Sequence, residues 1–314
     1  MSNSTLPSPG LTAFDNAPAA RADKKKGGFD WGRLVRYLLL FFFLIVVLIP
    51  VYVLVITSFK GIGDASPDRA WIFPQEFIGD NWLTAFFGDD LAKANPSIGA
   101  ALGRTLLMVV PAAVISSFLG SMNGFVLSRW RFPYANVVFT LLLFGMFIPY
   151  QAVMVPLYRM MTELWKYTPL TQGTPSLILL HVIYGIPITT LIFRNYYQSV
   201  PKELIESAKV DGAGMLRTYS NVVLPISIPS FVVVLIWQFT SAWNDFLFAV
   251  FFGGNPGTQA PVTVTLNMIA KGSIMTDYGI TMAAAFLASV PTLLIYVLLG
   301  KYFVGGLMAG SVKG

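Results

Sequence analysis

Side chains able to carry out covalent chemistry are scarce in this sequence. Its 314 residues include no cysteine and one histidine, His181. Cysteine nucleophiles, thiolate metal sites and multi-histidine metal sites are therefore excluded, and few nucleophile–base pairs remain. The sequence also lacks the GxxxxGK[ST] loop that cradles phosphates in common ATPases. We accordingly predict no catalytic residue, no metal ligand and no bound cofactor.

Charged groups with a clear helical spacing occur in one segment, residues 200–225. Pro201 suits the first position of a helix, and Glu203 lies in the first turn, near the positive end of the helix dipole. One face of this helix is apolar (Leu204, Ile205 and Ala208), and the other carries Lys202, Glu206 and Lys209. Gly212 can take the left-handed conformation that ends a helix. A second amphipathic stretch follows, so the sequence predicts two short helices joined by a sharp turn.

Long stretches without any charged residue must position this segment. Six of them, each of 19 to 27 residues, lie within 38–56, 105–128, 132–158, 167–193, 218–244 and 278–300. About 20 apolar residues cross the hydrocarbon core of a bilayer as a helix, and lipid offers the backbone no other hydrogen-bond partner. Charged residues make up only 11% of the chain, against about 25% in an average soluble domain. We predict an all-α integral membrane protein with six transmembrane helices.

The charge gaps also predict how the chain is divided. We expect a disordered tail at 1–30, a first transmembrane helix at 34–59, an external loop at 60–97, a core at 98–304 and a C-terminal tail at 305–314. Within the core we place helices at about 102–127, 134–153, 175–197, 226–251 and 279–301, a loop at 200–225 and a second external loop at 253–277. Pro149 and Pro156 interrupt the stretch at 132–158 and predict that residues 156–166 lie along the membrane surface.

The distribution of Lys and Arg predicts the orientation of these helices. With the N-terminus inside, the inside segments hold 14 Lys and Arg and the outside segments hold 7, whereas Asp and Glu number 6 and 9. The excess of Lys and Arg on the cytoplasmic side is the usual bias of membrane proteins. Both termini and residues 200–225 are therefore predicted to be cytoplasmic. The net charge of +6 then reflects topology in a lipid bilayer and indicates no nucleic-acid partner.

The segment from 200 to 229 resembles the EAA motif of ABC-importer permeases. It matches that motif at Glu206, Ala208, Asp211, Gly212, Ala213, Leu224 and Pro225, and carries Ser207 and Tyr219 where Ala and Phe are usual. Other segments are similar to the carbohydrate-uptake branch of these permeases, specifically the maltose-type, MalG-like subunit. These segments are 57–60, 129–133, 148–151, 243–247 and 303–314. Together they extend the resemblance from about Leu34 to the C-terminus.

The resemblance implies a type I ABC importer permease fold and a set of partners. These are a homologous second permease that completes a heterodimer, two cytoplasmic ABC ATPase subunits and an external solute-binding protein. The assembly would lie in a bacterial or archaeal cytoplasmic membrane, and the ATPase subunits would hydrolyse ATP. Coupling to them would fall to Glu203, Glu206, Ser207, Ala208, Asp211, Gly212 and Ala213. The C-terminal residues Gly310, Ser311, Val312, Lys313 and Gly314 would reach the ATPase interface.

The solute implied by the resemblance is a carbohydrate, expected to be a disaccharide or oligosaccharide, with a monosaccharide or glycerol phosphate as the alternative. Five residues are candidates for contact with it in the pore, namely Tyr150, Gln151, Trp243, Asn244 and Asp245. For Asp245 we favour a structural bond to backbone at a helix end over contact with sugar hydroxyls. Arg104 is expected to extend to the membrane interface.

Two other classes of protein remain as alternatives. An ion-coupled secondary transporter should carry ionisable residues inside its helices, and the six stretches hold only His181 at depth. No carboxylate shares the span of His181, so we favour a neutral histidine bonded to a neighbouring helix over a proton relay. A membrane-embedded enzyme is disfavoured because the sequence offers no acid–base constellation.

Overall fold

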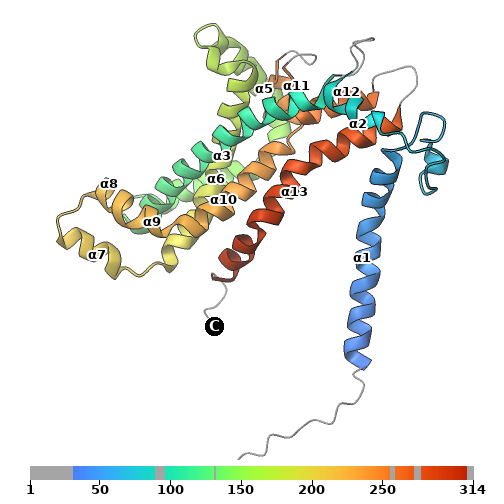
Figure 1. Cartoon of the computed structure of the whole chain (residues 1–314). Coiled ribbons are helices and arrows are strands. Elements are labelled where there is room, and N and C mark those ends of the chain that lie inside the picture. Colours follow the sequence, from blue (N-terminus) through green and yellow to red (C-terminus); the bar gives the residue numbers. More distant parts are fainter. Residues whose placement is uncertain (1–30, 89–95, 131, 255–258, 272–276, 310–314) are drawn as a thin grey trace, which may run out of the picture. The chain divides into compact units, whose positions relative to one another are not determined.

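The computed structural model describes residues 31–88, 96–130, 132–254, 259–271 and 277–309 (Figure 1). Every regular element among these residues is helical. The elements are α1 (Trp31–Thr57), η1 (Pro67–Arg69), α2 (Asp80–Phe87), α3 (Ile98–Arg129), α4 (Ala135–Phe147), α5 (Tyr150–Trp165), η2 (Pro169–Thr171), α6 (Gly173–Ser199), α7 (Glu203–Val210), α8 (Met215–Thr218), the π-helical turn η3 (Tyr219–Val223), α9 (Leu224–Ile226), α10 (Ile228–Trp243), α11 (Leu247–Phe252), α12 (Val262–Lys271) and α13 (Tyr278–Ala309). The predicted tail at 1–30 and residues 310–314 lie outside the described part.

The chain divides between Ile49 and Pro50 into two compact units. The described part of the first unit is the start of α1, where residues 38–43 are all large hydrophobics exposed by 52% to 65%. Six consecutive residues point in every direction around a helix. An apolar surface on all sides is typical of a helix surrounded by lipid or by other apolar helices.

Several helices of the described residues could cross a membrane. Four are long and apolar enough by themselves: α1, α3, α6 and α13 as far as Gly300. Two bent pairs raise the number to as many as six. The axes of α4 and α5 meet at 96°, and the segment from α8 to α9 meets α10 at 79°. The structure therefore confirms that the regular elements of the described residues are all helical, with four to six candidate spans among them.

Proline decides where one of these bends falls. The predicted helix at 134–153 is divided, because α4 ends at Phe147 and α5 begins at Tyr150. Pro149 lacks a backbone N–H and disfavours helical geometry at Ile148, which is extended with ψ of 120°. By contrast, α6 runs continuously from Gly173 to Ser199 through Pro187.

Helices also occur in regions that the sequence assigned to loops or tails. The helix α2 lies within the predicted loop at 60–97, and α12 lies within the predicted loop at 253–277. The last helix, α13, continues to Ala309. The predicted tail at 305–314 therefore begins inside a helix.

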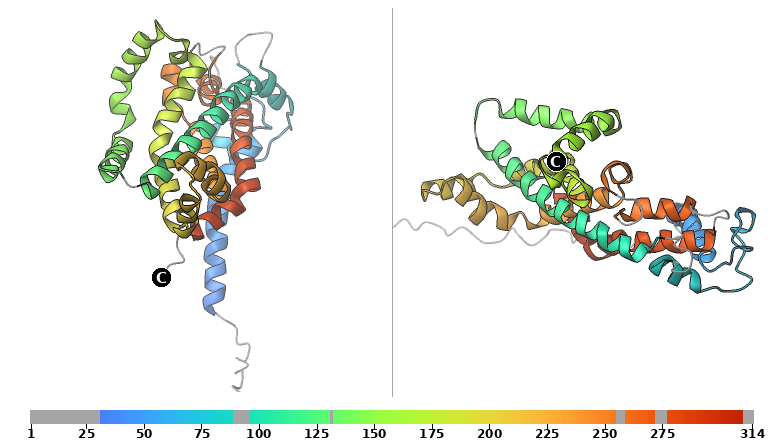
Figure 2. Two further views of the ribbon diagram at one scale, coloured as in Figure 1. Left: turned by 90° about the vertical axis from the view of Figure 1, so that its left-hand side faces the viewer. Right: turned by 90° about the horizontal axis from the view of Figure 1, so that it is seen from above.

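The helices α3 and α6 run side by side and form the main packed pair of the second unit (Figures 1 and 2). Two glycines of α3, four residues apart, lie in this contact. A Cβ atom on Gly120 would stand 2.1 Å from Thr189 Oγ1, and one on Gly124 would stand 2.8 Å from the backbone nitrogen of Arg194. Glycines spaced in this way let two helix backbones approach closely inside a membrane. The pair forms the scaffold on which the coupling segment is mounted.

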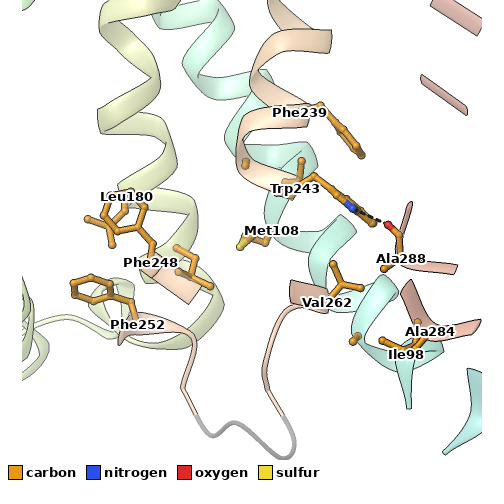
Figure 3. Packing of buried hydrophobic residues seen from close by; sticks show 14 of the residues in the cluster. Ile98, Met108, Leu180, Phe239, Trp243, Phe248, Phe252, Val262, Ala284 and Ala288 are labelled. Carbon is orange, nitrogen blue, oxygen red and sulfur yellow. Dashed lines mark hydrogen bonds between the residues drawn. The ribbon is translucent and has the colours of Figure 1, made fainter. Parts of the chain in front are cut away.

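A hydrophobic cluster joins α10, α11 and α13 to this pair (Figure 3). Trp243 at the end of α10 is 2% exposed and stacks on Phe239, with ring centroids 5.3 Å apart. Its indole nitrogen donates a hydrogen bond of 3.0 Å to the carbonyl of Ala288 on α13. The bond pairs the polar end of the ring inside an apolar core and fixes α10 against α13.

Candidate functional site

The helix α7 lies on the predicted coupling segment and packs through two side chains. Ile205 is 5% exposed and Ala208 is 9% exposed. Ile205 belongs to a cluster with Phe125 of α3 and Tyr197 of α6. Leu204, which the sequence placed on the same apolar face, is instead 44% exposed. One face of α7 is thus held against α3 and α6, and the other remains accessible.

The turn after α7 has the hydrogen bonds of a Schellman cap. Gly212 has a φ of 76°, in the left-handed region. Its N–H donates to Lys209 O at 3.0 Å, and the N–H of Ala213 donates to Ala208 O at 2.9 Å. Asp211, just before the glycine, is the C-cap residue of α7. The turn is thereby defined by backbone bonds alone and leads directly into α8.

Arg129, the last residue of α3, fixes the entry to α7. Its Nε donates to the carbonyl of Tyr197 at 2.8 Å, and its Nη2 donates to the carbonyls of Tyr197 and Val200. These carbonyls belong to the C-terminal end of α6, where a cation also complements the helix dipole. The next residue, Trp130, places its ring 4.6 Å from Nζ of Lys209. The C-terminal end of α7 thus contacts the end of α3, and Arg129 holds the end of α6 from which the chain enters α7.

A network of hydroxyl groups fixes the second half of the segment. Tyr219 of η3 donates to Ser121 Oγ at 2.9 Å, and Ser121 Oγ lies 2.5 Å from Tyr197 Oη. Ser227 donates to Tyr197 Oη at 3.0 Å. All four side chains are at most 8% exposed. Buried hydroxyls that satisfy one another favour a single arrangement of the helices that carry them, here α3, α6, η3 and the start of α10.

The accessible side of the segment carries most of the predicted coupling residues. Glu203, Glu206, Ser207, Asp211 and Gly212 are exposed, Ala213 is half-buried and Ala208 is buried. Two apolar side chains share this side, with Val210 exposed by 87% and Leu216 by 63%. In Figure 1, α7 and α8 project beyond the ends of α3, α6 and α10. A projecting surface of mixed charge and apolar character is typical of a protein-docking site.

Arg129 and Trp130 belong to the segment 129–133, whose sequence resembles the permease family, but their contacts could not be predicted from the sequence. The available signal was a basic residue at the end of a helix, which favours bonds to free carbonyls. Those carbonyls lie on another helix, so spacing along the chain did not identify them. Four hydroxyl-bearing residues of the network were missed for the same reason.

A cavity of about 740 Å³ lies where α4, α5, α6, α10 and α11 meet. Three of the five predicted pore residues line it: Tyr150, Asn244 and Asp245. Gln151 and Trp243 are not among its lining residues, and Trp243 is buried in the core. The lining is mostly apolar with a few polar groups, as is usual for small-molecule sites.

His181 and Asp245 face each other on the wall of this cavity. Their Nε2 and Oδ2 atoms are 3.7 Å apart, and the side chains are 7% and 8% exposed. The expected bond from His181 to a neighbouring helix is not formed by Nε2, which has no hydrogen-bond partner. A carboxylate also lies near it after all, since Asp245 follows α10 and approaches α6 through the fold. Charge gaps along a sequence do not reveal this proximity.

Asp245 has the structural contacts that we favoured. Its Oδ2 accepts from the backbone N–H of Ala249 at 3.1 Å, and its Oδ1 accepts from that of Phe248 at 3.4 Å. A carboxylate at the start of α11 satisfies free N–H groups of the first turn. These bonds fix the carboxylate in place on the cavity wall.

Arg104, expected at the membrane interface, makes a defined contact within the fold. Its Nε donates a bond of 3.0 Å to the carbonyl of Ala260. The neighbouring Thr105 accepts from the N–H of Val262 at 2.8 Å. The start of α3 therefore fixes the chain that leads into α12. Among the described residues, no group of three or more His, Cys, Asp or Glu side chains could hold a metal ion.

Comparison with known proteins defines the class to which this arrangement belongs. Residues 112–307 match the family described as the binding-protein-dependent transport system inner membrane component. The chain belongs to this family of ABC-transporter permeases. It is accordingly a multi-pass protein of the cytoplasmic membrane and a transport subunit, not an enzyme, and ATP hydrolysis belongs to separate subunits.

Individual relatives cover nearly the whole chain. The xylose/arabinose import permease protein XacI of Haloferax volcanii is 36% identical over 292 residues, covering 88% of this chain and 92% of its own length. The melibiose/raffinose/stachyose import permease protein MelC of Bacillus subtilis is 32% identical over 268 residues, covering 85% and 91%. A solved bacterial ABC transporter for the acidic polysaccharide alginate has a chain with a TM-score of 0.67 and 19% identity, covering 88% of this chain and 100% of its own. That likeness shows the fold.

Proposed function

We propose that this chain is the permease subunit of an ATP-driven importer of carbohydrate, and that residues 200–225 couple its pore to ATPase subunits. The observation that carries the proposal is the construction of that segment. A short helix follows the end of α6 that Arg129 holds, contacts Trp130 at the end of α3 through Lys209, turns sharply at Gly212 and leaves a charged face accessible. A segment fixed in this way transmits displacement instead of absorbing it.

The remaining partners follow from the family and from the distribution of charge. The proposed assembly contains a homologous second permease, two cytoplasmic ABC ATPases and an external solute-binding protein. Six spans with both termini in the cytoplasm place 14 Lys and Arg inside and 7 outside, which agrees with the usual bias. In this orientation the coupling segment lies on the cytoplasmic side, where ATP is available.

The proposed solute is a disaccharide or oligosaccharide. The import of melibiose, raffinose and stachyose by one relative supports this size, whereas xylose and arabinose, imported by another relative, represent the monosaccharide alternative. Binding measurements on the solute-binding protein of the proposed assembly, using raffinose, melibiose, xylose and arabinose, separate the two. Tighter binding of a pentose than of either oligosaccharide would contradict the proposed size.

One observation favours ion-coupled transport instead of ATP-driven transport, so the experiment must distinguish the two mechanisms. His181 on the candidate span α6 and Asp245 just after α10 bring two ionisable groups together, and an ion-coupled transporter requires ionisable groups of this kind. Sugar uptake is therefore measured in vesicles that contain the complete importer, with the ATPase subunits omitted in parallel. The proposal expects uptake only with the ATPases and ATP. Uptake driven by an ion gradient in their absence would refute it.

The coupling role of the segment is tested in the same vesicles. We expect Glu206→Ala or Gly212→Asp to leave membrane insertion intact and to uncouple ATP hydrolysis from uptake. The matched control is Glu163→Ala, which removes an exposed carboxylate paired with Lys166 far from the segment in the sequence. Normal sugar-stimulated ATPase activity and uptake in both test variants would exclude the coupling role.

The same proposal assigns the last residues of the chain to the ATPase interface. We expect removal of residues 311–314 to weaken control of ATP hydrolysis without preventing insertion. The measurement compares ATPase activity with and without the sugar-loaded binding protein. If the truncated protein showed wild-type ATPase activity under both conditions, the proposed role of this tail at the ATPase interface would be refuted.

A further inference from the structure

We propose that the cavity between α4, α5, α6, α10 and α11 is a binding site for a sugar ring, with His181 and Asp245 holding one of its hydroxyl groups. The inference rests on the proposed function and adds to it a contact between this subunit and its solute. It is carried by the volume of the cavity, a buried imidazole whose Nε2 has no hydrogen-bond partner, a fixed carboxylate and a set of aromatic rings.

The size of the cavity suits a small hydroxylated ligand. Its volume of about 740 Å³ falls within the range of about 300–1,000 Å³ that is usual for small-molecule sites. The lining combines apolar side chains with a few polar ones, including Gln238, Ser241 and Asn244. Such a lining matches a sugar, which has apolar C–H faces and a polar rim.

The unpaired Nε2 of His181 is the strongest sign that this cavity takes a polar ligand. His181 is 6% exposed, lines the cavity and has no hydrogen-bond partner for Nε2. Leaving a buried polar atom unpaired costs about 1–3 kcal/mol, so natural proteins rarely retain one without a reason. The backbone carbonyl of His181 accepts a bond of 3.0 Å from Gln238, which holds this turn of α6 in place.

The geometry of the pair suits a hydroxyl group. Nε2 of His181 and Oδ2 of Asp245 are 3.7 Å apart, too far for a strong bond with each other. A hydroxyl oxygen at about 2.8 Å from both atoms completes a triangle with them. A hydroxyl can donate to the carboxylate and accept from an imidazole N–H at the same time. An acyl chain of a lipid can do neither.

The aromatic rings of the cavity supply a surface for the apolar face of the same ligand. Tyr150, Tyr184 and Phe248 all line the cavity. The ring centroids of the two tyrosines are 6.4 Å apart. Each of them lies 5.1 Å from the ring centroid of Phe248. Phe248 lies beside Leu180 of α6 in Figure 3. A fixed aromatic cluster next to a hydrogen-bonding pair therefore presents both kinds of contact that a sugar ring requires.

Because the chain has one histidine, its imidazole can be observed without assignment. The full chain is produced with ¹⁵N-labelled histidine and a tag that lacks histidine, and is placed in lipid nanodiscs. Raffinose and arabinose are titrated separately as probes, and glycine betaine at equal osmolarity is the control without hydroxyl groups. We expect a saturable shift of the imidazole signals with at least one of the sugars and no shift with glycine betaine. A shift of equal size with glycine betaine, or none with either sugar, would overturn the inference.

Two variants separate ligand contact from a loss of structure. Asp245→Asn keeps one acceptor oxygen for the two N–H groups of α11 and loses the charge, and we expect it to weaken sugar binding about tenfold. The matched control is Asp277→Asn, since Asp277 also accepts from a helix N-terminus, at 3.2 Å from the N–H of Ile280, and does not line the cavity. Equal weakening by both variants would contradict the site.

The outcome is distinguishable from a failure of the proposed function. ATP-dependent uptake in the complete importer combined with no sugar-dependent histidine shift would refute only the site in this subunit. A saturable shift combined with uptake that needs no ATPase would refute the ATP-driven mechanism and leave the site intact.

Discussion

Replacing Gly212 by alanine tests whether the turn of the coupling segment must be left-handed. Its φ is 76°, and an ideal Cβ at this position meets no atom within 4 Å. A side chain there therefore causes no clash with the surroundings, and the cost comes from the backbone alone. An L-residue in this conformation costs about 1–2 kcal/mol. We expect Gly212→Ala to lower the population of the capped turn by a factor of about 5–30.

Hydrogen exchange of the two capping amides measures this change directly. The N–H groups of Gly212 and Ala213 donate to Lys209 O and Ala208 O at 3.0 and 2.9 Å, so opening of the turn exposes both. We expect faster exchange in Gly212→Ala and a smaller effect in Gly212→Asn, because asparagine tolerates the left-handed region better. ATP-coupled uptake should fall in the same order.

Gly214 provides the matched control two residues further on. An ideal Cβ there also meets nothing within 4 Å, and its φ of −69° and ψ of 173° are open to any residue. We expect Gly214→Ala to leave exchange at the turn and uptake unchanged. Unchanged exchange in Gly212→Ala, or equal acceleration in both variants, would refute the requirement for a left-handed turn.

Three further changes test the packing that supports the two sites. Gly120→Ala should destabilise the chain by about 1–3 kcal/mol, because its Cβ would stand 2.1 Å from Thr189 Oγ1, whereas Gly103→Ala meets nothing within 4 Å; equal melting temperatures in detergent would contradict this. Arg129→Gln should lower the free energy of unfolding by about 1.5–3 kcal/mol, because it removes the charged hydrogen bonds to the end of α6. It should also speed hydrogen exchange in α7, and unchanged exchange would show that these bonds are dispensable. Tyr219→Phe should lower the free energy of unfolding by about 1 kcal/mol through loss of its bond to the buried hydroxyl network, and an unchanged denaturation midpoint would argue against that contribution.

Features that depend on neighbouring residues in the chain could be predicted from the sequence. The long uncharged stretches indicated membrane helices because one helix satisfies its own backbone in lipid. The all-helical fold and the permease family were confirmed, as was the absence of enzymatic activity. The turn at Gly212 could be predicted because glycine is the residue for which a left-handed cap costs least. The assignment of the flanking residues to coupling remains a prediction.

Features that depend on which helices meet required the tertiary structure. The proximity of His181 to Asp245, the clamp of Arg129 on the end of α6 and the close contact at Gly120 each join residues from different helices. The division of the third predicted span at Pro149, with continuity of α6 through Pro187, also emerged only in three dimensions. The periodicity of a helical sequence shows which side chains share a face. It does not show which other helix packs against that face. The energy that chooses the partner comes from close packing and from pairing of buried polar groups, and both exist only once the helices are together.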